Sequence, residues 1–426
     1  MSVVARPRVD LRKMLERVHS ASPVEAVDVM ADGLAAMLGA DDVCFLITDL
    51  GGRAVARFGG SAANAARERQ RGVAHAPTVD LAGTGYERVL RSRRSEMAAV
   101  AGGARLIVPV TDRGDAIDAI DAIDAIDAID AIDVPWLPDE REVAEIAGAG
   151  RALAYVVVAC RRHTDLFEWA QRSTPFSLAP EIQRRLLPAA LTCETGQFTV
   201  AGWLEPPNTV GGDTVDYTLD RDTLHVSITD AVGHDVNAAM LATVPVGSLR
   251  NGRRRHMSLL DQARFTDEAP VRYSAVGQFG TGQLMRVDLR SSAMTIVNAG
   301  HPFPYRVRDG RAEEIELAID MPFGIEAVRA FEAQRVPLEP GDRILLVTDG
   351  ILERGAAHLD VLALLADTAR LHPREVVHTL GEAVLRATGG NLRDDATAVC
   401  IDWHGGPHRV RDDSGVQRQP GPPLSG

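Results

Sequence analysis

From Phe198 onward, the sequence alternates short apolar segments with turns, and an aspartate stands directly beside four of the segments that we expect to be strands. Segments of this length and composition are typical of β-strands, and two stretches between them have helical periodicity. Five of the expected strands lie at 198–203, 224–229, 294–297, 343–348 and 396–402, and a further strand is preceded or opened by residues 210–216. The expected helices lie near 235–250 and 372–388. Apolar sheet faces must be covered by helices or by a second sheet. The pattern therefore predicts a sandwich domain of the α+β class over residues 193–404.

The four aspartates are candidates for one shared metal site. Asp213 and Asp394 precede or open expected strands, and Asp230 and Asp349 end others. A rigid sheet can aim side chains at its strand ends toward one place, and a carboxylate there is costly unless it is paired or bound to metal. Oxygen ligands without a His or Cys cluster suit Mg(II) or Mn(II) better than zinc. Two such ions about 4 Å apart would activate a water for attack on a phosphoryl group.

Composition argues against several other function classes. Of the 46 basic residues, only Lys13 is a lysine, whereas P-loop, protein-kinase and Schiff-base enzymes each need a lysine in the site. The net charge of −13 argues against a nucleic-acid partner and against a metal-dependent nuclease. No apolar run reaches the ~18 residues of a membrane span, and the N-terminus lacks the apolar region of a signal peptide. We therefore expect a cytoplasmic protein without a membrane partner.

The order and spacing of the acidic segments resemble a known family. Residues 195–403 are similar to the SpoIIE-like branch of the PPM metal-dependent Ser/Thr protein phosphatases. The resemblance rests on the segments Val210–Tyr217, Asp230–His234, Asn298–Pro302, Gly341–Gly350 and Arg393–Thr397. It implies a PPM-type α/β-β/α sandwich with two Mn(II) or Mg(II) ions.

The same resemblance implies roles for individual residues. Asp213 and Asp230 would bridge or flank the ions, and Asp349 and Asp394 would complete the cluster. Ala231 would contribute its backbone carbonyl. Asp395 stands where relatives often have Asn or Asp, and we expect it to support the other metal-site residues.

The chain departs from the family pattern in three places. Thr214 and Val215 occupy the Gly-Gly-Asp motif, where relatives commonly have an aromatic residue. Asp235 replaces the last glycine of the usual Gly-His-Gly motif. Pro245 lies inside the following helix, where it removes a hydrogen bond and should kink the chain. None of these changes removes an expected metal ligand.

Several polar residues have two interpretations each. His234 and His301 either orient loops by hydrogen bonding or act as a general acid, and we favour the first role. Asp216 is either a structural carboxylate or an outer group of the metal site. The basic run 253–255 is either a solvated helix face or a phosphate-docking surface, and we favour the solvated face.

The N-terminal part, residues 9–165, is predicted to form a separate α+β module. Helical periodicity covers 9–40 and 139–172, and strands are expected at 43–47, 54–58 and 106–108. This module is similar to GAF domains, which implies a GAF-like sensor domain for an unknown ligand.

An unusual repeat interrupts the N-terminal module. Residues 115–132 are six copies of Asp-Ala-Ile, followed by Asp133. A period of three matches neither a strand nor a helix. We therefore favour a replication-slippage insertion in a loop or at a strand edge over a calcium-binding repeat, because the tract lacks the glycines that turn such loops. If so, shortening it to one copy should leave the phosphatase activity unchanged.

Residues 166–192 are expected to form a helical linker, and the tail 405–426 to be disordered. In the linker, Leu178, Ile182, Leu186 and Leu187 form an apolar stripe at helical spacing. Glu181, Arg184 and Arg185 could then face water.

These inferences describe a sensor-regulated protein phosphatase. The family resemblance points to a phosphorylated STAS-domain anti-sigma factor antagonist as the substrate. The alternative is a metal-poor pseudophosphatase that acts as a binding scaffold, which the intact aspartates disfavour. The sequence names neither the sensor ligand nor the oligomeric state, and a homodimer is one option.

Overall fold

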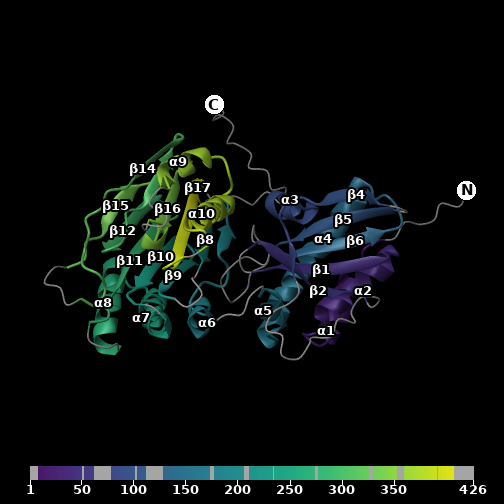
Figure 1. Ribbon diagram of the computed structural model, residues 1–426, viewed down its shortest axis with the longest axis horizontal. Coiled ribbons are helices and arrows are strands. Elements are labelled where there is room, and N and C mark those ends of the chain that lie inside the picture. Colours follow the sequence, from purple (N-terminus) through teal and green to yellow (C-terminus); the bar gives the residue numbers. More distant parts are fainter. Residues whose placement is uncertain are drawn as a thin grey trace, which may run out of the picture.

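The chain folds into two domains that lie side by side (Figure 1). The computed structural model describes residues 8–49, 52–61, 78–100, 103–111, 128–172, 177–205, 211–233, 235–273, 277–325, 330–352, 359–390 and 392–406. The predicted tail beyond residue 406 lies outside these residues. The short helix α5 (Leu166–Ala170) packs into the core of the N-terminal domain through Phe167 and Ala170. The short helix α6 (Leu178–Arg184) follows it in the sequence, before the C-terminal domain.

The N-terminal domain is a six-stranded antiparallel sheet in the order β3-β2-β1-β6-β5-β4. Its strands are β1 (Asp42–Thr48), β2 (Ala54–Gly60), β3 (Thr78–Asp80), β4 (Glu96–Val100), β5 (Gly103–Val110) and β6 (Ala128–Val134). One face packs against α1 (Leu11–Ser20), α2 (Ala26–Leu38) and α4 (Glu140–Cys160), and the other against α3 (Gly85–Ser92). The helical segment expected at 9–40 is therefore two helices, separated by residues 21–25, which include Pro23.

Helix α4 is the long apolar helix of this domain. Asp139 caps its first turn in a capping box with Glu142. Among the described residues, the stretch Glu140–His163 alone is long and apolar enough to span a membrane. Ile146, Leu153 and other apolar residues of this helix are buried in the core of the N-terminal domain. Its hydropathy is therefore accounted for by packing against the sheet.

The Asp-Ala-Ile repeat supplies a central strand of this sheet. β6 lies between β1 and β5 and pairs with both. Ile132 is fully buried on the face covered by α1, α2 and α4, whereas Ala131 is buried on the opposite face. Asp133 receives two hydrogen bonds from Arg105, at 2.8 and 2.6 Å. The expectation of a loop or strand edge is wrong for residues 128–133, and residues 115–127 lie outside the described part.

The repeat has an unusual consequence for strand register. Successive side chains of a strand point to opposite faces of the sheet. A shift of the pairing by one residue therefore moves the buried side chains to the other face. A shift by three residues inside the tract, however, places the same residue type at every position. Val134 breaks this equivalence, since it is 2% exposed and pairs with Ala104. The native register of β6 is therefore fixed at the end of the tract rather than within it.

The structure predicts that at least two copies of the triplet are needed. Deleting residues 115–123 leaves three copies and the whole of β6, so the melting temperature should change by less than about 3 °C, because loop closure depends weakly on length. Deleting residues 115–129 leaves one copy and removes Ala128 and Ile129, two of the seven residues of the central strand β6. That variant should lose the cooperative unfolding transition of the N-terminal domain in calorimetry. Native-like melting of the one-copy variant would show that β6 is dispensable.

The C-terminal domain consists of two antiparallel sheets packed face to face. The first has the order β15-β12-β11-β10-β9, and the second β14-β13-β16-β17-β8-β7. The strands of the first sheet are β9 (Asp213–Leu219), β10 (Thr223–Ala231), β11 (Gly280–Asp288), β12 (Ala293–Ala299) and β15 (Gln334–Pro337). Those of the second are β7 (Thr192–Glu194), β8 (Phe198–Glu205), β13 (Tyr305–Arg308), β14 (Arg311–Glu314), β16 (Arg343–Val347) and β17 (Ala396–Trp403).

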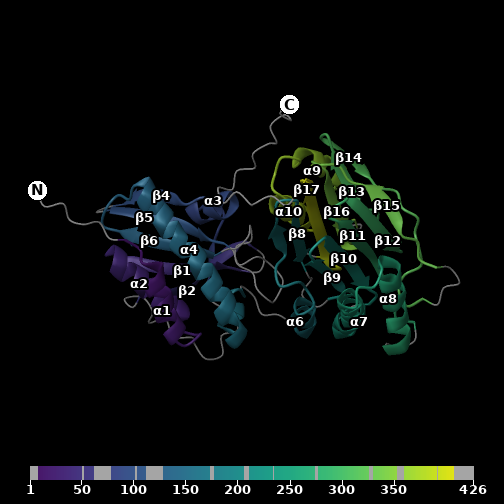
Figure 2. The same cartoon turned by 180° about the vertical axis from the view of Figure 1, so that it is seen from behind.

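Helices cover the outer faces of the sandwich. α7 (Asp235–Arg254) and α8 (Leu259–Tyr273) pack on the first sheet, and α9 (Val361–Asp367) and α10 (Pro373–Thr388) on the second. From the back, Figure 2 shows α6, α7 and α8 along the lower side and α10 on the side of the N-terminal domain. The expected α+β class and the α/β-β/α layering are confirmed.

Strand β16 shows how apolar runs produce this layering. Ile344 and Leu346 lie in the core between the sheets, whereas Leu345 and Val347 lie under α9 and α10. A strand buried on both faces needs apolar residues at every position. β17 alternates in the same way, which explains why both segments read as continuous apolar strands in the sequence.

Candidate active site

The fold brings the predicted metal-site aspartates to one end of the sandwich. Asp213 opens β9 and lies directly opposite Asp230 on β10. Asp349 follows β16, and Asp394 and Asp395 precede β17, the antiparallel neighbour of β16. Both sheets therefore contribute acidic side chains to the same edge. Ala231 follows Asp230, and its backbone carbonyl lies beside Gly212.

The carboxylates range from buried to exposed. Asp213 and Asp395 are 2% and 1% exposed, Asp230 and Asp394 are partly buried, and Asp349 is exposed. Burial, reinforced by the negative charges of Asp230 and Asp395, raises the pKa of Asp213 well above its ordinary value. Burial and the charges of neighbouring aspartates, Asp349 first, raise the pKa of Asp230 to about 7. The site therefore concentrates negative charge that a cation would stabilise.

Hydrogen bonds hold Asp213 in place. Its Oδ2 accepts from Thr348 Oγ1 at 2.7 Å and from Thr397 Oγ1 at 2.5 Å. Thr348 also accepts a hydrogen bond from the backbone N–H of Thr397, at 3.1 Å. The sequence analysis missed both threonines. Their signal is their position, since each lies within two residues of a predicted metal-site aspartate: Thr348 directly follows β16, and Thr397 lies on β17.

Asp395 links the two sheets and the connecting helix α6. Its Oδ2 accepts from the backbone N–H groups of Gly212, at 2.7 Å, and Asp213, at 3.0 Å. It also accepts from Gln183 Nε2 at 2.7 Å. Burial nevertheless raises the pKa of Asp395 to about 6, against the effect of these hydrogen bonds. Asp395 thus fixes the main chain at Asp213, as the expected supporting role requires.

Two glycines allow the strands to meet closely at this edge. A Cβ atom at Gly350 would lie 1.9 Å from the backbone oxygen of Asp395. A Cβ atom at Gly212 would lie 2.5 Å from the backbone oxygen of Ala231. Any larger residue would therefore push apart the segments that carry the aspartates.

The close approach at Gly350 predicts a specific defect. Gly350→Ala should lower the free energy of unfolding by about 3 kcal/mol, since overpacking against backbone cannot relax by a side-chain movement. Gly247→Ala is the matched control, because nothing lies within 4 Å of the added Cβ in the exposed part of α7. It should be neutral or stabilise by up to ~1 kcal/mol through helix propensity. Urea unfolding of both variants checks this, and equal stability of the two would refute the steric argument.

The aspartate cluster fits a divalent cation by its chemistry. Every predicted side-chain ligand is a carboxylate, and hard divalent cations prefer such oxygens. Asp395 Oδ1 is buried without a hydrogen-bond partner in the described part of the chain. Among the described residues, no group of three or more His, Cys, Asp or Glu side chains is arranged as a ready metal site. The aspartates are thus electrostatic neighbours whose oxygens do not yet converge, and their assignment as ligands stays a prediction.

Helix α6 inserts a polar residue into this cluster. Gln183 is fully buried and also donates to the backbone oxygen of Asp213, at 2.8 Å. The apolar stripe expected on this helix is wrong, since Leu178 is 61% exposed and Ile182 is only partly buried. Arg184, expected to face water, is 4% exposed. The side of α6 that packs on the sandwich was therefore not visible from apolar spacing.

Asp216 is part of a cluster that ties α7 to residues 186–187, which follow α6. It is 4% exposed and pairs with Arg250 and Arg253. Arg250 also donates to the backbone oxygens of Leu186, at 2.6 Å, and Leu187, at 3.1 Å. Of the two interpretations of Asp216, the structure favours the structural carboxylate. Arg253 is held in the same cluster and is not part of a solvated face.

His301 has a structural role. It is 3% exposed, and burial lowers its pKa to about 3. Its Nδ1 hydrogen-bonds with Thr281 Oγ1 at 2.9 Å, and its backbone N–H donates to Asn298 Oδ1 at 2.8 Å.

His234 lies outside the described residues. Helix α7 starts at Asp235 and continues through Pro245.

Comparison with known proteins identifies the C-terminal domain. Residues 220–404 match the family model described as Stage II sporulation protein E (SpoIIE). This part of the chain is therefore similar to the SpoIIE family. The family resemblance expected from the aspartate motifs is therefore confirmed for these residues, whereas the GAF-like character of the N-terminal domain stays a prediction.

Individual relatives of the C-terminal domain are distant. Phosphoserine phosphatase RsbP of Bacillus subtilis (strain 168) is 23% identical over 245 residues, or 53% of this chain. The match covers 57% of RsbP, so the chain spans little more than half of that relative.

Two solved structures are also similar. The RsbU and RsbW domains of Rv1364c from Mycobacterium tuberculosis are 23% identical, with a TM-score of 0.44 over 50% of this chain and 63% of that one. The PP2C phosphatase domain of SpoIIE from Bacillus subtilis, with a fragment of its regulatory domain, is 14% identical. Its TM-score is 0.43 over 75% of this chain and 86% of that one.

Proposed function

We propose that this chain is a metal-dependent protein serine/threonine phosphatase whose N-terminal domain regulates the C-terminal domain. One observation carries the proposal. Strands of both sheets bring acidic side chains to one edge, where the buried Asp213 lies opposite Asp230. Such an arrangement of like charges is unfavourable on its own and is typical of a divalent-cation site.

The residues have distinct roles in this proposal. Asp213, Asp230, Asp349 and Asp394, with the backbone carbonyl of Ala231, would hold two Mn(II) or Mg(II) ions. Bound ions would supply charge neutralisation and activation of a water. Thr348, Thr397 and Gln183 hold the buried carboxylates in position. Hydrolysis forms a bond from the water oxygen to phosphorus and breaks the phosphorus–oxygen ester bond. The serine or threonine hydroxyl leaves with a proton.

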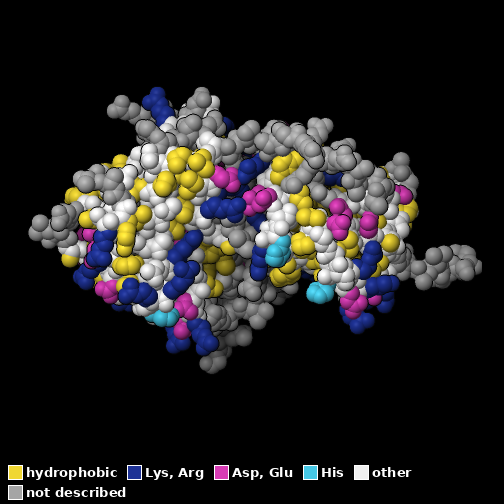
Figure 3. All heavy atoms as spheres, turned by 90° about the horizontal axis from the view of Figure 1, so that it is seen from below, with side chains coloured by type: hydrophobic (Ala, Val, Ile, Leu, Met, Phe, Trp, Pro, Cys, Tyr) yellow, Lys and Arg dark blue, Asp and Glu magenta, His cyan; other side chains and the backbone are white. Residues whose placement is uncertain are grey.

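Exposed apolar residues on α7 and α8 support a protein substrate. Met240 on α7 is 58% exposed, and Val271 and Tyr273 on α8 are 59% and 76% exposed. Viewed from below, the side of the domain that carries α7 and α8 mixes apolar side chains with basic and acidic ones (Figure 3). Exposed apolar groups beside arginines suit contact with a phosphorylated protein surface.

The finer parts of the proposal rest on family resemblance. They are a phosphorylated STAS-domain protein as the substrate, control by an unidentified sensor ligand and a cytoplasmic location. The name of the relative RsbP, a phosphoserine phosphatase, agrees with the reaction. The pseudophosphatase alternative is disfavoured because all four predicted metal-site aspartates are present at the same edge.

Asp349→Asn tests the reaction. Asp349 is exposed, so the variant should fold normally. Its Mn(II)-dependent hydrolysis of a phosphoserine peptide should fall at least about 100-fold, because an amide is a poorer ligand for a hard cation. Asp367→Asn, at the exposed end of α9, is the matched control and should keep full activity. Full activity of Asp349→Asn, or of the wild type in EDTA, would contradict a metal mechanism.

Gln183→Leu tests whether the connecting helix acts on the metal site. The substitution removes the hydrogen bonds to Asp395 and to the backbone of Asp213. Mn(II) affinity, measured by calorimetry, should fall about tenfold, the effect of losing one or two hydrogen bonds to a charged site. Leu178→Ala, at an exposed position of the same helix, should change neither affinity nor rate. If Gln183→Leu only lowers the melting temperature, the helix merely stabilises the sandwich.

A further inference from the structure

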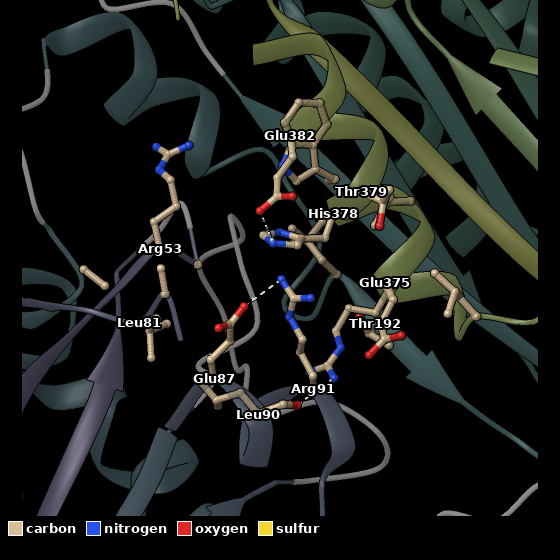
Figure 4. A pocket seen from close by; sticks show the side chains of 18 of the residues that line it. Arg53, Leu81, Glu87, Leu90, Arg91, Thr192, Glu375, His378, Thr379 and Glu382 are labelled. Carbon is tan, nitrogen blue, oxygen red and sulfur yellow. Dashed lines mark hydrogen bonds and ion pairs between the residues drawn. The ribbon is translucent and has the colours of Figure 1, made fainter. Parts of the chain in front are cut away.

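A cavity lies between the two domains, away from the aspartate cluster. Its volume is about 690 Å³, which is in the range of sites that hold small molecules. The N-terminal domain contributes Arg53, Leu81 and Leu90, and the C-terminal domain contributes Trp203, His378 and Glu382 (Figure 4).

Polar contacts join the two walls of this cavity. Arg53 forms an ion pair with Glu205 at 3.2 Å, and Arg374 donates to the backbone oxygen of Leu90 at 2.9 Å. Because the Arg53 side chain is 52% exposed, its ion pair contributes little to holding the domains together. A ligand that touches both walls can therefore add substantially to the docked arrangement.

The floor of the cavity is apolar and well supported. Leu81 and Leu90 are buried on the N-terminal side, and Trp203 is 7% exposed on the other. A Cβ atom at Gly381 would lie 2.4 Å from the ring of Trp203, so α10 packs directly on this ring. Trp203 is thus held in a fixed position, and its aromatic ring can attract a cation.

The charges that line the cavity are mostly paired within the protein. Arg91 pairs with Glu87 at 2.9 Å, and His378 with Glu382 at 3.3 Å; both pairs are drawn in Figure 4. Arg53 and Arg374 have the interdomain partners given above. The guanidinium groups are therefore already engaged, which disfavours an anionic ligand.

Two lining carboxylates differ from the others. Asp80 comes from β3, and Glu375 comes from α10 on the opposite wall. Asp80 accepts a hydrogen bond from the backbone N–H of Ala82, at 2.9 Å. Within the described residues, neither carboxylate has a cationic partner. Each domain thus presents a negative group to the cavity without an internal counter-charge.

We propose that this cavity binds a small organic amine that bridges the two domains. The ammonium group is held by Glu375 and Asp80, and the apolar body lies on Leu81, Leu90 and Trp203. Such a ligand binds the docked arrangement more tightly than the separated one, because each domain supplies part of the site.

The strand register connects this cavity to the metal cluster. Glu205, the partner of Arg53, ends β8 and lies opposite Ala396 on β17. Ala396 directly follows Asp395, which positions Asp213. Occupation of the cavity therefore acts on strands that carry the aspartates, and this regulatory step rests on the proposed phosphatase function.

Binding is tested first, on the full chain without added metal. Titration calorimetry uses 2-phenylethylamine as the probe and 2-phenylethanol as its neutral match. The amine should bind, and Glu375→Gln and Asp80→Asn should each weaken it about tenfold, the usual effect of removing one charged hydrogen-bond partner. Glu140→Gln, at the exposed start of α4, is the control and should leave binding unchanged.

The outcomes separate the proposal from its alternatives. Equal binding of 2-phenylethanol, or equal binding of the amine by all variants, would overturn the assignment of an amine site. No saturable binding up to about 10 mM, the range of very weak ligands, would overturn the site itself. A second arm measures Mn(II)-dependent hydrolysis with the amine present. Binding without any hydrolysis in the wild type would refute the phosphatase function while leaving the amine site intact.

Discussion

Negative charge is concentrated at the edge where the two sheets of the C-terminal domain meet, and Asp213 and Asp395 are almost fully buried there. Burying like charges is costly unless donors or cations compensate. Thr348, Thr397 and Gln183 provide neutral donors, and close strand approach at Gly350 fixes their spacing. Compensation is incomplete, since burial and mutual repulsion still raise the pKa of Asp213. This residual cost is what favours a divalent cation.

The aspartate cluster is reached from the N-terminal side of the chain by two separate contacts. Gln183 on the connecting helix donates directly to Asp395. Arg53 of the N-terminal domain pairs with Glu205, opposite the residue that follows Asp395. The first contact ends at the buried carboxylate of Asp395, which holds the main chain at Asp213. The second ends at Glu205, whose strand partner Ala396 is the next residue in the chain. Under the proposed regulation, a change in domain docking would alter the surroundings of a group that orders the site, without a large movement within the sandwich.

Sequence patterns predicted the strands that depend on the residue types within the segment itself. The apolar runs of β16 and β17 and the aspartates beside them lie as expected. The repeat was misjudged because its period of three fits no regular element, yet pairing with β1 and β5 imposes the strand on it. The apolar stripe of α6 was wrong because Gln183, rather than Leu178, faces the sandwich, and Arg184 is buried as well. A polar residue buried against a charged site leaves no signal in hydrophobic spacing.

The sequence by itself determined the α+β class and the aspartates at strand ends, because residue type and local periodicity encode them. The order of the acidic motifs was enough to indicate the similarity of the C-terminal domain to the SpoIIE family. Only the tertiary structure decided which donors meet those aspartates. Thr348 and Thr397 are separated from Asp213 by more than a hundred residues, and they meet only because the sheets pack face to face. The interdomain cavity is likewise a product of docking, since its walls come from β3, α3, β8 and α10. Contacts between distant segments depend on how the whole chain packs, which no local pattern specifies.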